Sequence, residues 1–247
     1  MGFFSRLFSS DETEPSEGQI RRAIKQVTQT HGEAANRVGA MERLAAWRTP
    51  ESAAALLRRF TVQTPRATMD LEERQYAVKL LTEMGEIAID PIIAWLKISP
   101  DVAYPAQALK NICTPERYLA AIMEILEVLS SGYTRWPDAA VVLITGLEDE
   151  FFPQIGGTVF RFLDDNNDDV CIAAAEYLSR NGGEAVREKL IQVYLTADGR
   201  PRVQGSILDL FHERQWGVGK YKKDVEAVIS LPFYLTSKGM VKRREQM

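Results

Sequence analysis

The chain has 247 residues, of which 45% are hydrophobic and 26% charged, and its formal net charge is −4. These fractions are ordinary for a globular protein, and the mild acidity argues against a dedicated nucleic-acid-binding protein, which usually carries a strong basic excess. No apolar run approaches the roughly 18 residues that a membrane-spanning helix needs.

The first eighteen residues are expected to form a flexible segment and a linker rather than part of the folded body. Residues 9–18 are polar and contain a proline and a glycine, as linkers do. Residues 1–8 lack the basic start and continuous apolar core of a signal peptide, but four large apolar side chains fall at helical spacing. The alternatives for this segment are a frayed terminus, docking on the body of the protein, and peripheral contact with a membrane or a partner. The four side chains are those of Phe3, Phe4, Leu7 and Phe8.

A small residue followed four positions later by a large apolar residue recurs along the rest of the chain. Successive steps between the first members are 37, 31, 32, 34 and 32 residues. A period in this range is typical of a solenoid of helical hairpins. The pairs are Ala40/Leu44, Ala77/Leu81, Ala108/Ile112, Ala140/Ile144, Ala174/Leu178 and Ser206/Leu210.

Nearly every segment between residues 19 and 231 shows apolar residues at the 3.6-residue spacing of a helix, and no convincing alternating strand appears. Proline, glycine and capping residues divide this region into a lead-in helix and six hairpins. The chain is therefore predicted to be all-α, with a basic tail over residues 232–247. The predicted helices span residues 19–30, 35–47, 51–62, 71–84, 87–98, 101–112, 115–130, 136–147, 150–163, 169–180, 184–195, 202–214 and 222–230.

Two stretches of the chain carry a family resemblance. Leu80–Gly85 followed by Ile89–Leu96 resembles a HEAT repeat, particularly the short bacterial kind similar to phycobilisome-lyase HEAT repeats. Val170–Leu178 followed by Gly182 and Gly183 is similar to another. The resemblance covers roughly residues 35 to 230 and implies a right-handed α-solenoid (α-α superhelix) of about six HEAT-like hairpins. It specifies function poorly, because the family includes scaffolds, adaptors, lyase subunits and nucleic-acid binders.

The residues able to hold a metal or form a disulfide are few. Cys113 and Cys171 lie far apart on apolar stretches, which favours reduced, buried thiols in a cytosolic protein. The two cysteines and two histidines lie too far apart in the sequence to form a recognisable zinc-binding motif. The acidic run at residues 164–169 begins like a calcium loop but has Asp169 where glycine is needed and Ala175 where glutamate is needed. A turn whose last aspartates cap the next helix explains this run, so no metal and no cofactor is expected.

No catalytic constellation is visible in the sequence. His31 and His212 accompany no serine or cysteine in a recognisable nucleophile elbow, and the Gly-Gly pairs at residues 156–157 and 182–183 do not form a phosphate-cradling loop. The carboxylates are scattered over many helices, as on solvated faces. An enzyme is therefore not expected.

The second helices of the predicted hairpins share a gap of two residues between core positions. In HEAT-like arrays these helices line the concave surface, so the residues in the gap are expected to project onto one face. The set mixes charge signs and includes one large aromatic, which suits a peptide or protein ligand better than a phosphate backbone. An ordinary solvated groove is the alternative. The residues are Arg58, Arg59, Trp95, Glu127, Arg161 and Gln192.

Two further aromatic residues, Tyr133 and Trp136, fall in or beside a predicted loop. Exposed aromatic side chains there could anchor a partner. Together with the groove, they lead to the interpretation of a cytoplasmic, non-enzymatic HEAT-like scaffold or adaptor that binds a protein or peptide. The alternatives are a DNA-binding or DNA-repair HEAT-like protein and, on the resemblance alone, a chromophore-lyase-type subunit.

Overall fold

The computed structural model describes residues 14–131, 136–147 and 152–244. Within these ranges the chain forms thirteen α-helices, three short 3₁₀ helices and two short strands, so the all-α prediction is confirmed. The chain divides into two compact units, residues 1–118 and 119–247, and helix α7 (Pro115–Leu129) crosses the boundary between them.

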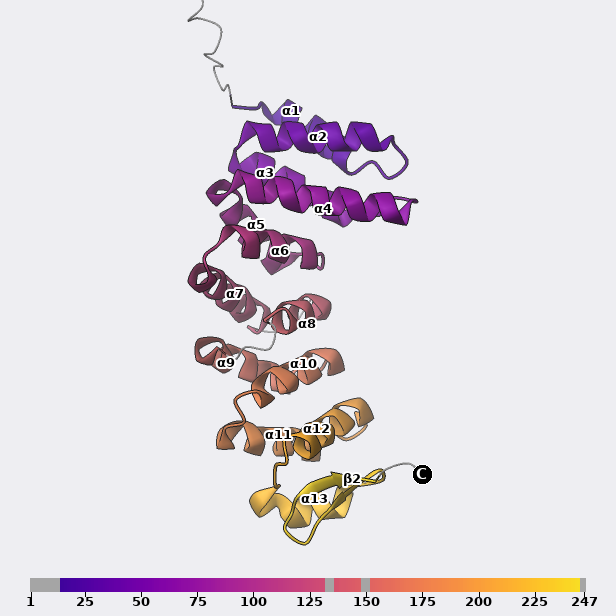
Figure 1. Cartoon of the computed structure of the whole chain (residues 1–247), viewed down its shortest axis with the longest axis vertical. Helices are drawn as coiled ribbons and strands as arrows, with labels where there is room; N and C mark the ends of the chain where they lie inside the picture. Colours follow the sequence, from indigo (N-terminus) through magenta and orange to yellow (C-terminus); the bar gives the residue numbers. More distant parts are fainter. Residues whose placement is uncertain (1–13, 132–135, 148–151, 245–247) are drawn as a thin grey trace, which may run out of the picture. The chain divides into compact units, whose positions relative to one another are not determined.

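In the amino-terminal unit, the first helices of successive hairpins contact one another, and so do the second helices (Figure 1). Helix α2 contacts α4, and α4 contacts α6, while α3 contacts α5; α1 packs against α2 and α3. The elements are α1 (Glu17–Val27), α2 (Ala34–Trp47), α3 (Pro50–Leu57), η1 (Arg58–Thr61), α4 (Ala67–Met84), α5 (Glu86–Ile98) and α6 (Ala103–Ile112).

Capping residues fix the starts of several helices in this unit. Ser16 and Gln19 form a capping box, so α1 begins at Glu17, inside the segment expected to be a linker. Thr49 accepts a hydrogen bond from the backbone N–H of Ser52 at 3.1 Å, which confirms the predicted start of the second helix before a proline. By contrast, α4 begins at residue 67, four residues before its predicted start.

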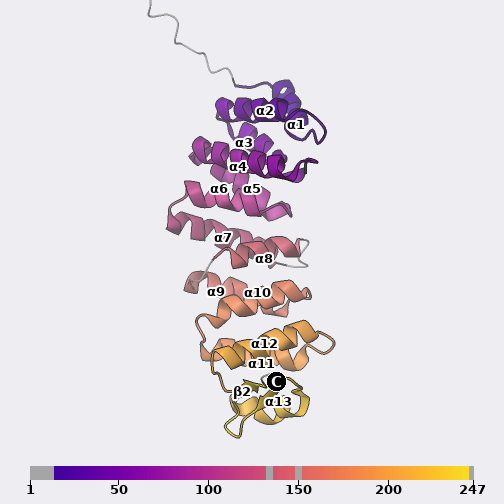
Figure 2. The same cartoon turned by 45° about the vertical axis from the view of Figure 1, so that its right-hand side comes forward.

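The carboxyl-terminal unit repeats the same kind of contacts. Helix α8 contacts α10, and α10 contacts α12, which lies beside it in Figure 2. Helix α11 contacts η2, α12 and α13. The elements are α8 (Pro137–Thr145), α9 (Pro153–Val159), η2 (Phe160–Asp164), α10 (Asp168–Ser179), α11 (Glu184–Thr196), α12 (Pro201–Glu213), η3 (Gly219–Tyr221), α13 (Lys222–Val228), β1 (Phe233–Leu235) and β2 (Val241–Arg243).

Among the described residues up to 244, the predicted basic tail contains a folded β-hairpin, which was not predicted from the sequence. Strand β1 pairs antiparallel with β2, and Phe233 and Val241 are buried. The basic side chains are engaged by the body of the unit: Arg243 lies 3.0 Å from a carboxylate oxygen of Asp209, and Lys242 donates to Gln215 at 2.6 Å. The hairpin therefore packs on α12 as part of the fold.

The recurring small/large pairs mark the buried face of the first helices. All six pairs fall in these helices, α2, α4, α6, α8, α10 and α12. Ten of the twelve residues are buried, and only Ile112 and Ser206 are half-buried. A small residue at these positions lets neighbouring helices approach closely, and the large one fills the space between them. The sequence period of these pairs therefore matches the interval at which first helices recur in the buried core.

Candidate functional site

The predicted groove residues of the amino-terminal unit have unequal exposure. Arg58 is exposed, and its guanidinium carbon lies 5.4 Å from the ring centroid of Trp95, in cation–π geometry. Trp95 itself is only 8% exposed, and its indole N–H donates to the carbonyl of Asp101 at 2.9 Å. The expectation that Trp95 projects into a groove was therefore wrong: its ring is part of the core, with Arg58 above it.

The prediction that Arg59 projects onto the exposed groove face was also wrong. Its side chain is fully buried, so it cannot contribute to an exposed face. One Nη atom donates to Asp70 at 2.6 Å, and Nε donates to Glu73 at 3.1 Å. The reason is that η1 turns Arg59 inward, toward two carboxylates on α4, while Arg58 faces solvent.

These residues belong to a buried ionic cluster of five side chains. Arg37 donates to both oxygens of Glu73, at 2.7 and 2.8 Å, and Arg74 donates to Asp70 at 2.6 Å. Every carboxylate in the cluster thus meets two guanidinium groups, which compensates for much of the cost of removing the charges from water. The members are Arg37, Arg59, Asp70, Glu73 and Arg74.

The charges of the ionic cluster lower the pKa of Asp70. Burial alone would raise the pKa of this carboxyl, but hydrogen bonds from Arg59, Arg74 and the backbone N–H of Thr64 hold it at about 2. The hydrogen bonds that Arg37 donates to the Glu73 carboxylate raise the pKa of Arg37 despite burial. Asp70 therefore stays ionised throughout the physiological range, as a structural anion.

The ionic cluster went unrecognised in the sequence because of the late predicted start of α4. The predicted helices at 51–62 and 71–84 left residues 63–70 as a polar connection, so Asp70 was not placed on one helix with Glu73. With the helix starting at residue 67, Asp70 and Glu73 fall three positions apart on one helix face. The available signal was the interval of 36 residues between Arg37 and Glu73, which is close to one repeat.

In the carboxyl-terminal unit, the predicted groove residues of the second helices are on the surface. Glu127, Arg161 and Gln192 are all exposed, on α7, η2 and α11 respectively. Gln192 donates to the hydroxyl of Tyr221 at 3.0 Å. Trp136 is half-buried and immediately precedes α8. Tyr133 lies outside the described residues.

The acidic run at residues 164–169 forms a turn whose side chains are bound by the protein itself. Asn167, rather than an aspartate, caps α10 by accepting from the N–H groups of residues 169 and 170. Asp164 pairs with Lys189, Asp168 with Arg200 and Asp169 with Arg202. No group of three potential metal-ligating side chains occurs among the residues that the structure describes.

Both cysteines are free thiols. Cys171 is buried, and its Sγ donates to the carbonyl of Leu163 at 3.3 Å. Burial raises the pKa of this thiol to about 11, so it is a poor nucleophile. Cys113 is half-buried, and its pKa is also raised, mainly by burial. Neither cysteine has the lowered pKa of a reactive thiol.

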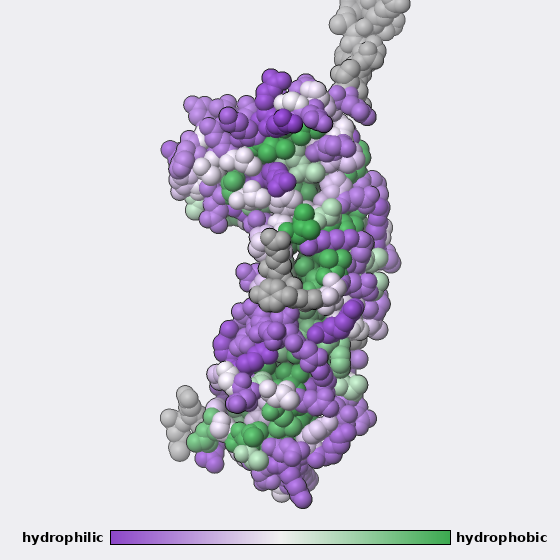
Figure 3. Space-filling view, turned by 180° about the vertical axis from the view of Figure 1, so that it is seen from behind, coloured by the Kyte–Doolittle hydropathy of each residue, from purple (hydrophilic) through white to green (hydrophobic). Residues whose placement is uncertain are grey.

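The remaining surface shows where apolar side chains reach solvent. Figure 3 shows hydrophilic residues over much of the visible face, interrupted by apolar patches. At the end of the carboxyl-terminal unit, Val228, Leu231 and Tyr234 are exposed by 51%, 70% and 41%. None of the helices within the described ranges has the length and apolar character that crossing a membrane requires.

Comparison with protein-family models, with curated proteins and with solved structures gave no match to this chain.

Proposed function

We propose that this chain is a non-enzymatic, HEAT-like α-solenoid scaffold that binds a protein or peptide through the exposed face of its second helices. The solenoid part of the proposal is supported by the contacts within each unit, where first helices meet first helices and second helices meet second helices. Nearest-neighbour stacking of this kind is what repeat arrays require. The sequence period of 31 to 37 residues supports it independently.

The observation that carries the binding proposal is the exposure of equivalent positions in four of the hairpins, on η1, α7, η2 and α11. Arg58 in the amino-terminal unit, and Glu127, Arg161 and Gln192 in the carboxyl-terminal unit, all reach solvent where the repeat pattern predicts a ligand-facing position. Arg58 is also held over the edge of the core by the ring of Trp95, which restricts its freedom before any ligand binds.

The charges of these residues favour a polypeptide over a nucleic acid. A phosphate backbone selects uniform lysine and arginine, because affinity comes from neutralising successive phosphates. The exposed set contains Glu127 between two arginines in the chain. A peptide with alternating charges and apolar side chains matches such a surface better.

The test is the recovery of native partners from a cell lysate by the tagged full-length protein. The double variant Arg58→Glu, Arg161→Glu reverses two charges on the proposed surface. The matched control, Arg21→Glu with Arg202→Glu, makes the same change in net charge at two exposed sites elsewhere. The proposal predicts partner loss in the first variant only. Equal recovery in both would contradict it, and retention of the wild type on DNA at moderate salt would favour nucleic-acid binding instead.

A further inference from the structure

Helix α13 and the β-hairpin that follows it expose large apolar side chains to water. Val228 ends α13, Leu231 lies in the next turn, and Tyr234 lies on β1; all three are exposed, Leu231 by 70%. The turn is closed by a hydrogen bond of 3.0 Å from the backbone N–H of Phe233 to the carbonyl of Ser230. Figure 3 shows apolar residues among hydrophilic ones at this end of the unit. Side chains on a tight turn protrude, so these residues present a convex apolar tip rather than a groove.

The register of the hairpin divides its side chains into an inner and an outer face. Successive side chains of a strand point to opposite faces, and residues directly opposite each other share a face. Phe233 and Val241 are buried, so theirs is the inner face, toward α12. Tyr234 pairs with Lys242, which places both on the outer face. Arg244, two residues after Lys242, follows it on that face.

Arg244 lies beside both Tyr234 and the turn. Its guanidinium carbon is 5.8 Å from the centroid of the Tyr234 ring, in cation–π geometry. Its backbone N–H donates to the carbonyl of Pro232 at 2.8 Å, next to Leu231 in the chain. An apolar tip, an aromatic ring and a guanidinium group therefore lie together on one surface. This surface, the hairpin patch, consists of Val228, Leu231, Tyr234, Lys242 and Arg244.

The charge around the hairpin patch is strongly positive. Residues 219–244 contain seven basic and two acidic side chains, a net charge of +5, whereas the whole chain carries −4, so its other residues carry −9. Two of the basic residues are neutralised, since Lys220 pairs with Glu188 and Arg243 pairs with Asp209. A positive surface on an otherwise acidic chain favours an anionic partner. The exposed basic residues of this segment without an ion-pair partner within the described ranges are Lys223, Lys238 and Arg244.

We propose that the hairpin patch docks on the surface of an anionic lipid bilayer. Leu231 and Val228 enter the boundary between headgroups and acyl chains, where surface-bound proteins bury apolar side chains. The ring of Tyr234 lies at the headgroup level, which suits a side chain with an apolar body and a polar tip. Arg244 and the neighbouring lysines meet the anionic headgroups. This contact uses none of the second-helix residues proposed above to bind a polypeptide.

Other partners fit the hairpin patch less well. A nucleic acid would engage the basic side chains but leave Leu231 and Val228 in water, because phosphate contacts come from lysine and arginine. A second copy that met the patch through a two-fold axis would bring the unpaired basic groups of both copies together. Asp224 lies one helical turn before Val228 on α13 and opposes an anionic surface. Its neutralisation should therefore strengthen binding to anionic lipid.

Co-sedimentation of the full-length protein with lipid vesicles tests the docking. One preparation is phosphatidylcholine alone, and the other contains equal parts of phosphatidylcholine and phosphatidylserine. Arg244→Glu should weaken binding to the anionic vesicles about tenfold, because each basic charge contributes about 1 kcal/mol near such a surface. Leu231→Ser should weaken it about fivefold, because the inserted apolar area is lost. Asp224→Asn should strengthen it severalfold.

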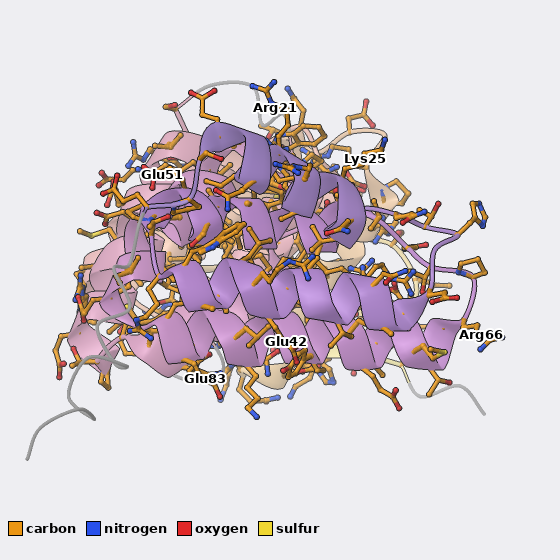
Figure 4. All side chains as sticks on the ribbon, turned by 90° about the horizontal axis from the view of Figure 1, so that it is seen from above. Arg21, Lys25, Glu42, Glu51, Arg66 and Glu83 are labelled. Atoms are coloured by element: carbon orange, nitrogen blue, oxygen red, sulfur yellow. The ribbon has the colours of Figure 1, made fainter. Side chains whose placement is uncertain are left out.

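The control variants make the same substitutions at exposed sites of the amino-terminal unit. Ile98→Ser matches Leu231→Ser, since Ile98 is 71% exposed. Arg21→Glu matches Arg244→Glu, and Figure 4 shows Arg21 on the opposite side of that unit from Glu83. Both controls should bind as the wild type does. The melting temperatures of the two patch variants should stay near the wild-type value, because the replaced side chains are exposed, so that lost binding reports the surface.

Each outcome either supports the docking or overturns it. Binding to the anionic vesicles that rising salt weakens, and that both patch variants reduce, supports it. No binding to either preparation, or binding that both variants retain, overturns it. Binding that Leu231→Ser leaves unchanged, with equal retention on DNA, would assign the basic residues to nucleic acid. A lipid-free dimer that Leu231→Ser disperses would assign the patch to a second copy and overturn the lipid contact. None of these results bears on partner recovery through Arg58 and Arg161.

Discussion

Arg37 and Glu73 lie 36 residues apart in the sequence and form a two-point ion pair inside the folded protein. Nε and Nη2 of Arg37 donate to the two oxygens of Glu73 at 2.8 and 2.7 Å, and both side chains are about 95% buried. The remaining Nη of Arg37 donates to the carbonyls of Gln29 and Gly32. One guanidinium thus ties α2, α4 and the turn after α1 together in a fixed geometry.

The first prediction concerns this pair. Glu73→Gln should lower the free energy of unfolding by about 3–5 kcal/mol, because it leaves two buried arginines short of a counter-charge. Glu83→Gln is the matched control on the same helix, since Glu83 is exposed and 3.7 Å from Lys79, and should cost under about 1 kcal/mol. Urea unfolding of both variants measures the difference. Equal costs would show that the buried pair contributes nothing beyond a surface pair.

The second prediction is a pH dependence of stability that comes from Asp70. Its pKa is lowered from 3.8 to about 2, so its contribution is fully present above about pH 5 and is lost as the pH falls toward 2. The contribution amounts to about 2 kcal/mol. Asp70→Asn should therefore be less stable at pH 7 and lose less stability than the wild type between pH 5 and 2.

The control for Asp70 is Asp198→Asn, which changes an exposed carboxylate. Its stability should follow the wild-type pH profile, measured by urea unfolding at several pH values. If the free energy of unfolding of Asp70→Asn falls between pH 5 and 2 as steeply as that of the wild type, the pKa of Asp70 is not lowered in the folded protein.

The third prediction compares two glycines with positive φ in the carboxyl-terminal unit. Gly182 has φ of +61°, and a Cβ there would lie 2.9 Å from the ring of Trp216. Gly199 has φ of +75°, but a Cβ there would meet nothing within 4 Å. Gly199→Ala should cost about 1–2 kcal/mol from the backbone alone, and Gly182→Ala should cost more, because the indole ring must also move. Equal melting temperatures for the two variants would mean that the Trp216 ring moves away from the added Cβ at no measurable cost in stability.

The helices were largely predictable from the sequence because their signals are local. Apolar spacing, the Thr49–Pro50 start and the glycines between helices depend only on neighbouring residues. All thirteen predicted helices have a counterpart among the described residues, with shifted ends. The recurring small/large pairs also located the buried face of the first helices, because close packing restricts residue size there.

What could not be predicted depends on contacts between distant residues. Arg59 was expected on the surface beside Arg58, and its burial follows from carboxylates 11 and 14 residues further on. The hairpin at residues 233–243 has strands of three residues, too short for an alternating pattern to be recognised.

Binding of a polypeptide by the exposed face of the second helices is tested most directly by site-specific photo-crosslinking at that face. A photoreactive residue replaces Arg58, Arg161 or Gln192, one at a time, and mass spectrometry identifies what is captured in cells. Arg21 and Arg202, which are also exposed and lie on α1 and the first helix α12, serve as control positions. Binding through the second helices should give the same polypeptide crosslinked at the three surface positions and absent from both controls. Crosslinks that are equally frequent at the controls, or nucleic acid as the captured species, would contradict it.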